Sequence, residues 1–333
     1  MERGVKMILA DASGAELRYI ADGQIDVELG GDNDFLVTFP RSAWRSDIAD
    51  GSRLYIPGTE YGGIVRRIET DTAMDTIAAG GLTWRGMLAH KIIRPAPGAD
   101  YATATGDVGT ILGGYVETEF PGLFVGGGAA GVSVGGFQFA RYCTLLDGLS
   151  AMLATVGYRL HIEYSEGAPG VSGQAVASAV PIADYSQTVE LSENAKLNYK
   201  AVKSRDGVNH LVCLGKGELA ERIVVDLYTD AAGNISTVQT FTGAEEIAEV
   251  YDNSGAELED LTEGGKQRLA EIMSKTSFSM DVAALDLEGI EIGDVIGGRD
   301  YLSGIYMTKP VTGKVYKFDG SAETIEYSIS DEQ

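Results

Sequence analysis

Residues 61–95, YGGIVRRIETDTAMDTIAAGGLTWRGMLAHKIIRP, contain the pattern that decides the predicted fold. Residues 63–69 and 75–79 have the composition of short strands, and the polar residues 71–74 between them favour a turn. This part of the stretch therefore predicts a β-hairpin.

A short helix is predicted directly after the hairpin. Thr83 stands where an N-cap is expected, and Trp84, Met87 and Leu88 follow at helical spacing. Pro95 cannot continue a helix, so the element ends before it.

The C-terminal part of the chain repeats the hairpin pattern. Residues 313–319 (GKVYKFD) align with residues 63–69 (GIVRRIE), and Thr324-Ile325 aligns with Thr76-Ile77. The match is short, and the general sequence pattern of hairpins is an alternative explanation. With β-rich flanks on both sides, we interpret it as two copies of one small barrel at the two ends of the chain. The helix with Trp84, Met87 and Leu88 is then expected to pack against the first barrel.

The fold class predicted from these patterns is α+β and β-rich, with two similar β-barrel domains, an inserted α+β domain and a few helices. We expect a first barrel in residues 1–95, the α+β insertion in residues 96–188, and a second barrel in residues 189–333 with a helical insertion at residues 243–275. The N-terminal strands are expected at residues 6–9, 25–29, 35–39 and 53–56.

The insertion contains the clearest helix signals. Asp107 can cap a helix that ends before Pro121, and apolar residues of 145–156 fall at helical spacing before Gly157. Residues 158–164 alternate strictly and predict a strand. The glycine-rich residues 126–136 between them predict a flexible loop, whose contacts the sequence does not reveal.

The third region is predicted to be mostly β. Strands are expected at residues 209–214, 223–228, 235–241, 277–282, 294–296, 304–310, 314–318 and 324–328. Two helices are expected, one over residues 244–250 and one starting at Thr262.

Charge limits the function. The chain of 333 residues has 26 basic and 49 acidic residues, a formal net charge of −23, and shows no cluster of Lys and Arg. Phosphate-directed binding to nucleic acid is therefore not expected. The excess of acidic residues has two explanations: ordinary solubility, or a surface that repels DNA so that the DNA can slide past.

Cys143 and Cys213, the two cysteines, are expected to be buried free thiols rather than a disulfide. No secretion signal or apolar run long enough to span a bilayer is present in the sequence, so no membrane insertion is predicted.

No catalytic, cofactor-binding or metal-ligating set emerges from the motifs, and no such site residues are assigned. His90, His161 and His210 stand far apart, and carboxylate pairs such as Glu117 with Glu119 and Glu245 with Glu246 carry little information in so acidic a chain. Residues 126–131 satisfy G-x-G-x-x-G, but no helix is predicted after them, so a dinucleotide site is not expected.

Four segments give the chain a resemblance to a known family. Residues 63–65 (GIV), 84–88 (WRGML), Arg94-Pro95 and 209–218 (NHLVCLGKGE) resemble the tail-hub proteins of long-tailed bacteriophages and prophages. The likeness is spread over most of the chain.

This resemblance implies a non-enzymatic virion structural protein of the tail tip, related to the baseplate hub. Such hubs carry two β-barrel tube domains, and three copies form a homotrimeric ring that continues the tail tube and lets DNA pass. The implied partners are further copies of the chain and neighbouring distal-tail and tip or fibre proteins. The implied locations are the virion tail and, during assembly, the host cytoplasm.

Two other functions stay open at this point. One is a tail-associated peptidoglycan hydrolase that uses two of the many carboxylates. The other is a carbohydrate-binding adhesin that uses the tyrosines of residues 158–164 and 301–316.

Overall fold

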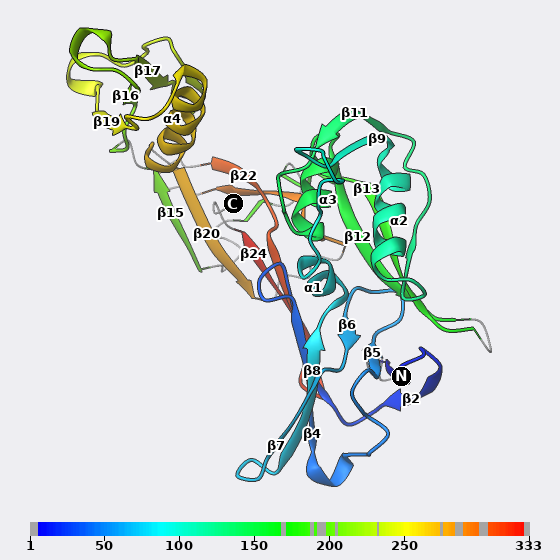
Figure 1. Ribbon diagram of the computed structural model, residues 1–333. Helices are drawn as coiled ribbons and strands as arrows, with labels where there is room; N and C mark the ends of the chain where they lie inside the picture. Colours follow the sequence, from blue (N-terminus) through cyan, green and yellow to red (C-terminus); the bar gives the residue numbers. More distant parts are fainter. Residues whose placement is uncertain are drawn as a thin grey trace. The chain divides into compact units, whose positions relative to one another are not determined.

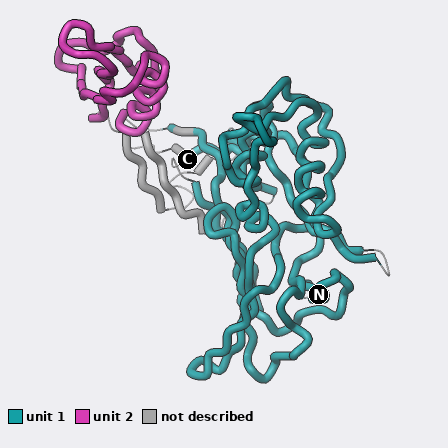
Figure 2. The backbone as a smooth tube through the Cα atoms, viewed as in Figure 1, with its two compact units in different colours: residues 1–199, 280–333 teal, residues 200–279 magenta. Residues whose placement is uncertain are grey.

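The computed structural model describes residues 6–167, 171–186, 190–191, 198–203, 206–231, 233–273, 276–283, 289–299 and 306–329. The chain divides into two compact units (Figure 2). Unit 1 comprises residues 1–199 and 280–333, and unit 2 comprises residues 200–279. The predicted division at residues 95/96 and 188/189 is a different partition of the chain, and it stays a prediction.

The largest sheet has eight strands in the order β15-β20-β24-β23-β3-β4-β8-β7. These strands are β3 (Gln24–Leu29), β4 (Asp34–Pro40), β7 (Arg67–Asp71), β8 (Thr76–Leu82), β15 (Asn198–Lys203), β20 (Thr276–Ala283), β23 (Gly313–Phe318) and β24 (Glu323–Ile329). Neighbours from β20 to β7 are antiparallel. Because β23 pairs with β3, the two ends of the chain build one sheet.

One face of this sheet is buried in an apolar core. The alternation in β3 and β4 turns Ile25, Val27, Phe35 and Val37 inward, as period-two patterns require. Residues of a second sheet, of order β2-β1-β5-β6, belong to the same core. Its strands are β1 (Met7–Ala10), β2 (Glu16–Ile20), β5 (Arg53–Tyr55) and β6 (Gly62–Ile64).

The opening stretch forms three strands where two were predicted. Residues 63–69 do not form one strand, because the chain changes sheets at Val65: β6 pairs with β5, whereas β7 pairs with β8. The predicted turn is correct, and the Asp71 carboxylate accepts hydrogen bonds from the backbone N–H groups of Ala73 and Met74.

Helix α1 (Trp84–Ala89) begins at the predicted cap, where the Thr83 hydroxyl accepts a hydrogen bond from the Gly86 N–H. Trp84 and Leu88 do not belong to the core of the first sheets. They are buried in a separate core formed mainly by the inserted region, where Trp84 stacks on Tyr164 at 4.7 Å between ring centroids. The helix also contacts strands β6 and β8, so the predicted packing against the N-terminal region holds in part, and the packing with the inserted region was not predicted.

The inserted region combines two helices with two small sheets (Figure 1). Its elements are β9 (Thr103–Asp107), α2 (Val108–Glu119), β10 (Phe124–Gly126), β11 (Ser133–Gln138), α3 (Leu145–Ala154), β12 (Tyr158–Ser165) and β13 (Gln174–Pro181). Asp107 caps α2 as predicted, and Gly157 after α3 has a φ of 73°. The strand at residues 158–164 is confirmed, with Leu160, Ile162 and Tyr164 buried.

The glycine-rich segment is held against α2, which the sequence did not indicate. The Asp107 carboxylate accepts hydrogen bonds from the N–H groups of Ala130 and Gly131, and the Glu117 carboxylate accepts one from Gly126. A Cβ at Gly109 of α2 would collide with the carbonyl oxygen of Gly128. Glycines on both sides therefore permit backbone-to-backbone contact.

Unit 2 contains a sheet of order β18-β17-β16-β19 and one helix. Its elements are β16 (His210–Leu214), β17 (Val224–Thr229), β18 (Ile235–Ser236), β19 (Ala248–Asp252) and α4 (Leu258–Ile272). Leu211 and Cys213 of the sheet share a core with Leu261 and Leu269 of the helix. The helix predicted over residues 244–250 is wrong: a single 3-10 turn, Gly243–Glu245, precedes strand β19.

A further sheet in unit 1 has the order β14-β21-β22, with β14 (Glu190–Leu191), β21 (Val295–Arg299) and β22 (Tyr306–Pro310). Residues 304–305 of the predicted strand at 304–310 lie outside the described residues. Cys143 and Cys213 are both free thiols. Cys213 is buried as predicted, whereas Cys143 is only half-buried. Within the described ranges no sheet closes on itself, so the two barrels stay a prediction. Every helix in the described part of the chain is too short or too polar to span a membrane.

Candidate functional surface

The second face of the eight-stranded sheet is not covered by the apolar core. We call the side chains that β3, β4, β7, β8, β23 and β24 turn to this side the open face. They include Gln24, Asp26, Glu28, Asp34, Leu36, Thr38, Arg67, Glu69, Asp71, Thr76, Ala78, Gly80, Val315, Lys317, Thr324 and Glu326. All of them except Gly80 are exposed or half-buried.

Strand register places these residues in rows across the sheet. One row runs from Lys317 through Asp26, Leu36 and Gly80 to Arg67. Arg67 and Lys317 are the residues matched in the sequence repeat. Arg67 ends this row on β7, and Lys317 is followed only by Thr324 on β24. The neighbouring row runs from Gln24 through Thr38 and Ala78 to Glu69, so its middle is small and neutral.

Acidic groups predominate on the open face. It carries six carboxylates, on Asp26, Glu28, Asp34, Glu69, Asp71 and Glu326, against the two cations Lys317 and Arg67. Lys317 is paired with one of these carboxylates, because its Nζ lies 3.5 Å from the Glu326 carboxylate. The open face is therefore a negatively charged surface.

Asp26 shows how crowded these charges are. Partial burial raises the pKa of its carboxyl group, and Lys317 opposes that effect by stabilising the ionised form. The negative charges of Asp34 and Glu326 raise the pKa of Asp26 further, so the net shift is upward. The carboxylates of three different strands thus act on one another.

The carboxylates and histidines considered from the sequence do not form a shared site. Glu119 pairs with Lys91, and Glu246 accepts a hydrogen bond from His210. His161 lies 3.8 Å from Glu163 on its own strand. Within the described ranges no group of three or more His, Cys, Asp or Glu residues is arranged to hold a metal ion.

Two of the tyrosines considered for sugar stacking are buried, whereas Tyr158 is half-buried and Tyr306 is exposed. Tyr164 is fully buried between Tyr55 and Trp84, and Tyr316 is buried against Tyr61. A buried ring cannot stack on a sugar in solution, so these two residues do not support the adhesin hypothesis. Tyr301 lies outside the described residues.

The open face was not identified from the sequence, although one signal for it was present. Residues 24–29, QIDVEL, alternate polar and apolar side chains. This alternation indicates a strand with one solvent-exposed face. The pairing of β23 with β3, about 290 residues apart in sequence, has no local signal. Without that pairing the charges of the two chain ends cannot be placed on one surface.

Comparison with known proteins gives a match only at the level of structure. No family model matches this chain, and no curated protein matches it. The 43 kDa tail protein of prophage MuSo2 from Shewanella oneidensis matches with a TM-score of 0.55 and 13% identity, over 97% of this chain and 98% of that one. The tail protein from Neisseria meningitidis MC58 matches with a TM-score of 0.52 and 14% identity, over 98% and 96%.

A third similar structure is a protein of the p2 virion baseplate in its activated conformation. It matches with a TM-score of 0.51 and 9% identity, over 99% of this chain and all of that one. The chain therefore has the fold of phage and prophage tail proteins and of a virion baseplate protein. The resemblance inferred from the sequence is confirmed at the level of the fold.

Proposed function

We propose that this chain is a structural component of a phage or prophage tail, and that its copies form a ring at the baseplate end of the tail tube. In this proposal the open face lines the channel through which DNA passes. The observation that carries the proposal is the acidic character of that face, with six carboxylates and two cations.

The physical reason is electrostatic. Double-stranded DNA carries one negative charge per about 1.7 Å of its axis, and proteins hold it mainly through Lys and Arg contacts to phosphates. A channel lined by carboxylates offers no such contacts, so DNA moves past it without being retained. The net charge of −23 acts in the same direction.

The end strand of the sheet supports assembly into a ring. β7 is the last strand in the sheet order, and all five of its residues are exposed. An exposed end strand presents backbone N–H and C=O groups that are available to a strand of another chain. Pairing between copies would use these groups and would continue the sheet around a channel.

The two-barrel division belongs to this proposal. The hairpins β7–β8 and β23–β24 flank the hairpin β3–β4 in one sheet, and they contain the two halves of the sequence repeat. We propose that residues 1–95 and 189–333 supply one tube domain each, with residues 96–188 inserted between them. Three copies would then give the six domains of a homotrimeric hub.

The proposed partners are further copies of the chain and adjacent tail proteins, in the virion tail and in the host cytoplasm during assembly. The role is non-enzymatic. Incubation of the purified protein with peptidoglycan should release no muropeptides, with a known lysozyme as positive control. Release of muropeptides by the pure protein would contradict the non-enzymatic role and favour the hydrolase.

Cryo-electron microscopy of tails that contain the chain tests the ring directly. The expected result is a three-fold ring with six lobes around the tube axis, with strands β3 and β23 facing the channel. Density that places the chain outside the channel, or turns the open face away from it, would contradict the proposal.

A further inference from the structure

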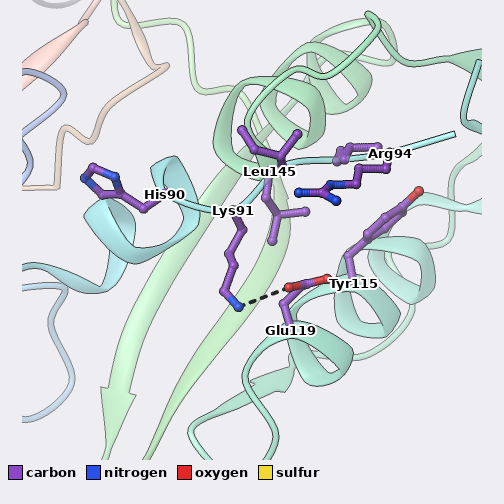
Figure 3. A pocket seen from close by; sticks show the side chains of 8 residues that line it. His90, Lys91, Arg94, Tyr115, Glu119 and Leu145 are labelled. Atoms are coloured by element: carbon purple, nitrogen blue, oxygen red, sulfur yellow. Dashed lines mark ion pairs between the residues drawn. The ribbon is translucent and has the colours of Figure 1, made fainter.

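A pocket with cationic side chains lies in unit 1, away from the open face. It has a volume of about 480 Å³ and is formed by the segment after α1 together with α2 and the start of α3. The lining residues are His90, Lys91, Ile92, Ile93, Arg94, Tyr115, Glu119 and Leu145. In Figure 3 the side chains of Arg94 and Glu119 extend into the same space, whereas the His90 ring is turned away from them.

Lys91 and Glu119 form an ion pair at this pocket. The Lys91 Nζ lies 3.2 Å from the Glu119 carboxylate and 5.0 Å from the centroid of the Phe120 ring. Both paired side chains are well exposed, so Lys91 keeps donors available to a further acceptor. The pair cancels its own charge, and Arg94 adds a net positive charge to the pocket.

Arg94 is exposed and forms no hydrogen bond or ion pair with any described residue. Among the described residues, Arg45 and Arg67 are likewise exposed and form no ion pair. Arg18, Arg85, Arg159 and Arg222, for comparison, each contact a carboxylate. A free guanidinium is a rigid fork of donors that matches a carboxylate group.

The rest of the pocket suits the stem of an acidic side chain. Ile93 and Leu145 are buried and give it an apolar floor. Burial raises the pKa of Tyr115, so its phenol stays protonated and can donate a hydrogen bond. The pocket is therefore mainly polar, with an apolar floor against which the stem of a side chain can pack.

We propose that this pocket binds an acidic side chain of a second copy of this chain, with the carboxylate held between Arg94 and Lys91. The inference rests on the proposed ring, which places copies next to one another. Charge complementarity is the argument for a second copy, because the chain has 49 acidic residues against 26 basic ones and so offers many carboxylates to a cationic pocket. The contact would be one element of the subunit interface.

A photo-cross-linker placed at Ile92 tests the inference. Ile92 lines the pocket with 42% of its surface exposed, so Ile92→p-benzoylphenylalanine leaves Arg94 and Lys91 in place. Heavy-isotope and light copies of the full chain are mixed, irradiated and digested, and mass spectrometry separates links between copies from links within one copy. We expect links between copies that map to segments containing Asp or Glu.

Matched charge variants show whether Arg94 is responsible. Arg94→Glu in the cross-linking background should lower the yield between copies at least about fivefold, and ~0.5 M NaCl should lower it similarly because salt screens the contact. Arg66→Glu is the control, since Arg66 is an exposed arginine outside the pocket. Its yield should be unchanged, and far-ultraviolet circular dichroism should show that both variants are folded.

Three results would overturn the inference: links only within one copy, an unchanged yield in Arg94→Glu, or links in assembled tails only to other tail proteins. Electron microscopy of the same samples separates this failure from failure of the ring. Rings that persist in Arg94→Glu with an unchanged yield reject the pocket contact and leave the proposed function standing. The opposite result is also possible: the links between copies depend on Arg94, but the tails contain no ring. This result would support the pocket contact and reject the ring.

Discussion

Lys317 on β23 lies directly opposite Asp26 on β3, on the open face of the eight-stranded sheet. The same ammonium group lies 3.5 Å from Glu326 on β24. One cation therefore lies next to carboxylates on both of its neighbouring strands. The net charge of this part of the sheet stays negative.

Reversing the charge of the open face should create DNA binding. In the variant Asp26→Lys, Glu28→Lys, Glu326→Lys, three cations replace three carboxylates near Lys317, and phosphate contacts become available. We expect retention of linear double-stranded DNA in a gel-shift assay at low salt, and no retention by the wild type.

The control for that experiment has the same change in net charge at another place. Glu218, Glu259 and Asp260 are exposed residues of unit 2. The triple lysine variant at these positions should bind DNA clearly more weakly than the open-face variant. Equal binding by both variants would show that net charge alone is responsible, and that the open face has no special role.

Asp26→Asn should stabilise the protein at neutral pH. The folded state raises the pKa of Asp26, so the ionised carboxylate destabilises the fold above that pKa, and the penalty disappears as the pH falls towards the unfolded value of about 3.9. Because the group is largely solvated, the gain should be under about 1 kcal/mol, or roughly 1–2 °C in Tm. Thermal unfolding at pH 7 and near pH 3 should show a gain only at pH 7. A variant less stable than the wild type at pH 7 would contradict the repulsion described here.

The sequence was sufficient for elements whose signals are local. Thr83 and Asp107 cap their helices as predicted, because a capping side chain contacts residues only three positions away. Strand β12 was predicted correctly because a strand with one buried face alternates apolar and polar side chains, and this alternation is visible in the sequence. The segment after Thr242 was predicted to be a helix, but pairing of residues 248–252 with β16 made it a strand.

Long-range pairing explains the larger differences. Nothing near Gly63 indicates that the chain changes sheets two residues later, because the partners of β6 and β8 lie in separate sheets. Trp84 and Leu88 have an apolar pattern that fits any core, so the pattern could not show that they pack with the inserted region. The open face and the pocket at Arg94 depend on such pairings and could not be assembled from the sequence.

Removing Arg85 should be strongly destabilising. Arg85 and Glu60 are both more than nine-tenths buried and share two hydrogen bonds, of 2.7 Å and 2.9 Å. Arg85→Met leaves the Glu60 carboxylate without its partner in a buried position, which costs about 3–5 kcal/mol. Urea unfolding monitored by tryptophan fluorescence measures this, since Trp84 is the adjacent residue.

Two further variants separate the ion pair from general packing. Arg85→Met combined with Glu60→Leu should recover part of the lost stability, because no unpaired charge remains. Arg41→Met removes an exposed arginine 3.8 Å from Asp75 and should change stability by less than about 1 kcal/mol. A double variant less stable than the single Arg85→Met would contradict this interpretation.

Two glycines of α2 should respond in opposite ways to alanine. Gly109→Ala should be destabilising by a few kcal/mol, because its Cβ would meet the carbonyl oxygen of Gly128 in the glycine-rich segment. Gly114→Ala, in the same helix, has no atom within 4 Å of the new Cβ and should stabilise by up to about 1 kcal/mol. Thermal unfolding of both variants checks the pair. Equal effects would show that the segment is not packed on α2 as described.

The stability of unit 2 should depend on the protonation of His210. Its Nδ1 lies 2.6 Å from Glu246 and its Nε2 lies 2.9 Å from Asp226, while the ring stacks on Tyr228 at 4.3 Å between centroids. Burial lowers the pKa of His210, but the hydrogen bonds and charges of Asp226 and Glu246 raise it by more. The imidazolium therefore holds β16 to β17 and to the segment before β19.

The sign of the pH effect follows from the raised pKa. The stabilising contribution is fully present below the unfolded value of about 6.5 and is lost as the pH rises through the folded pKa of His210. His210→Gln should be less stable than the wild type by about 1–3 kcal/mol near pH 6, the range of hydrogen bonds to charged groups, and the difference should shrink near pH 9. Urea unfolding followed by circular dichroism measures this.

Nuclear magnetic resonance titration of the histidine ring protons supplies the independent check. The chain has three histidines, so the signal missing from His210→Gln identifies this residue. His161→Gln is the matched control, because the His161 ring is more exposed and lies 3.8 Å from Glu163 on its own strand. His161 belongs to unit 1, so its loss should not affect the contacts that hold unit 2 together. A His210 signal that titrates below about 6.5 would contradict the two-carboxylate clamp.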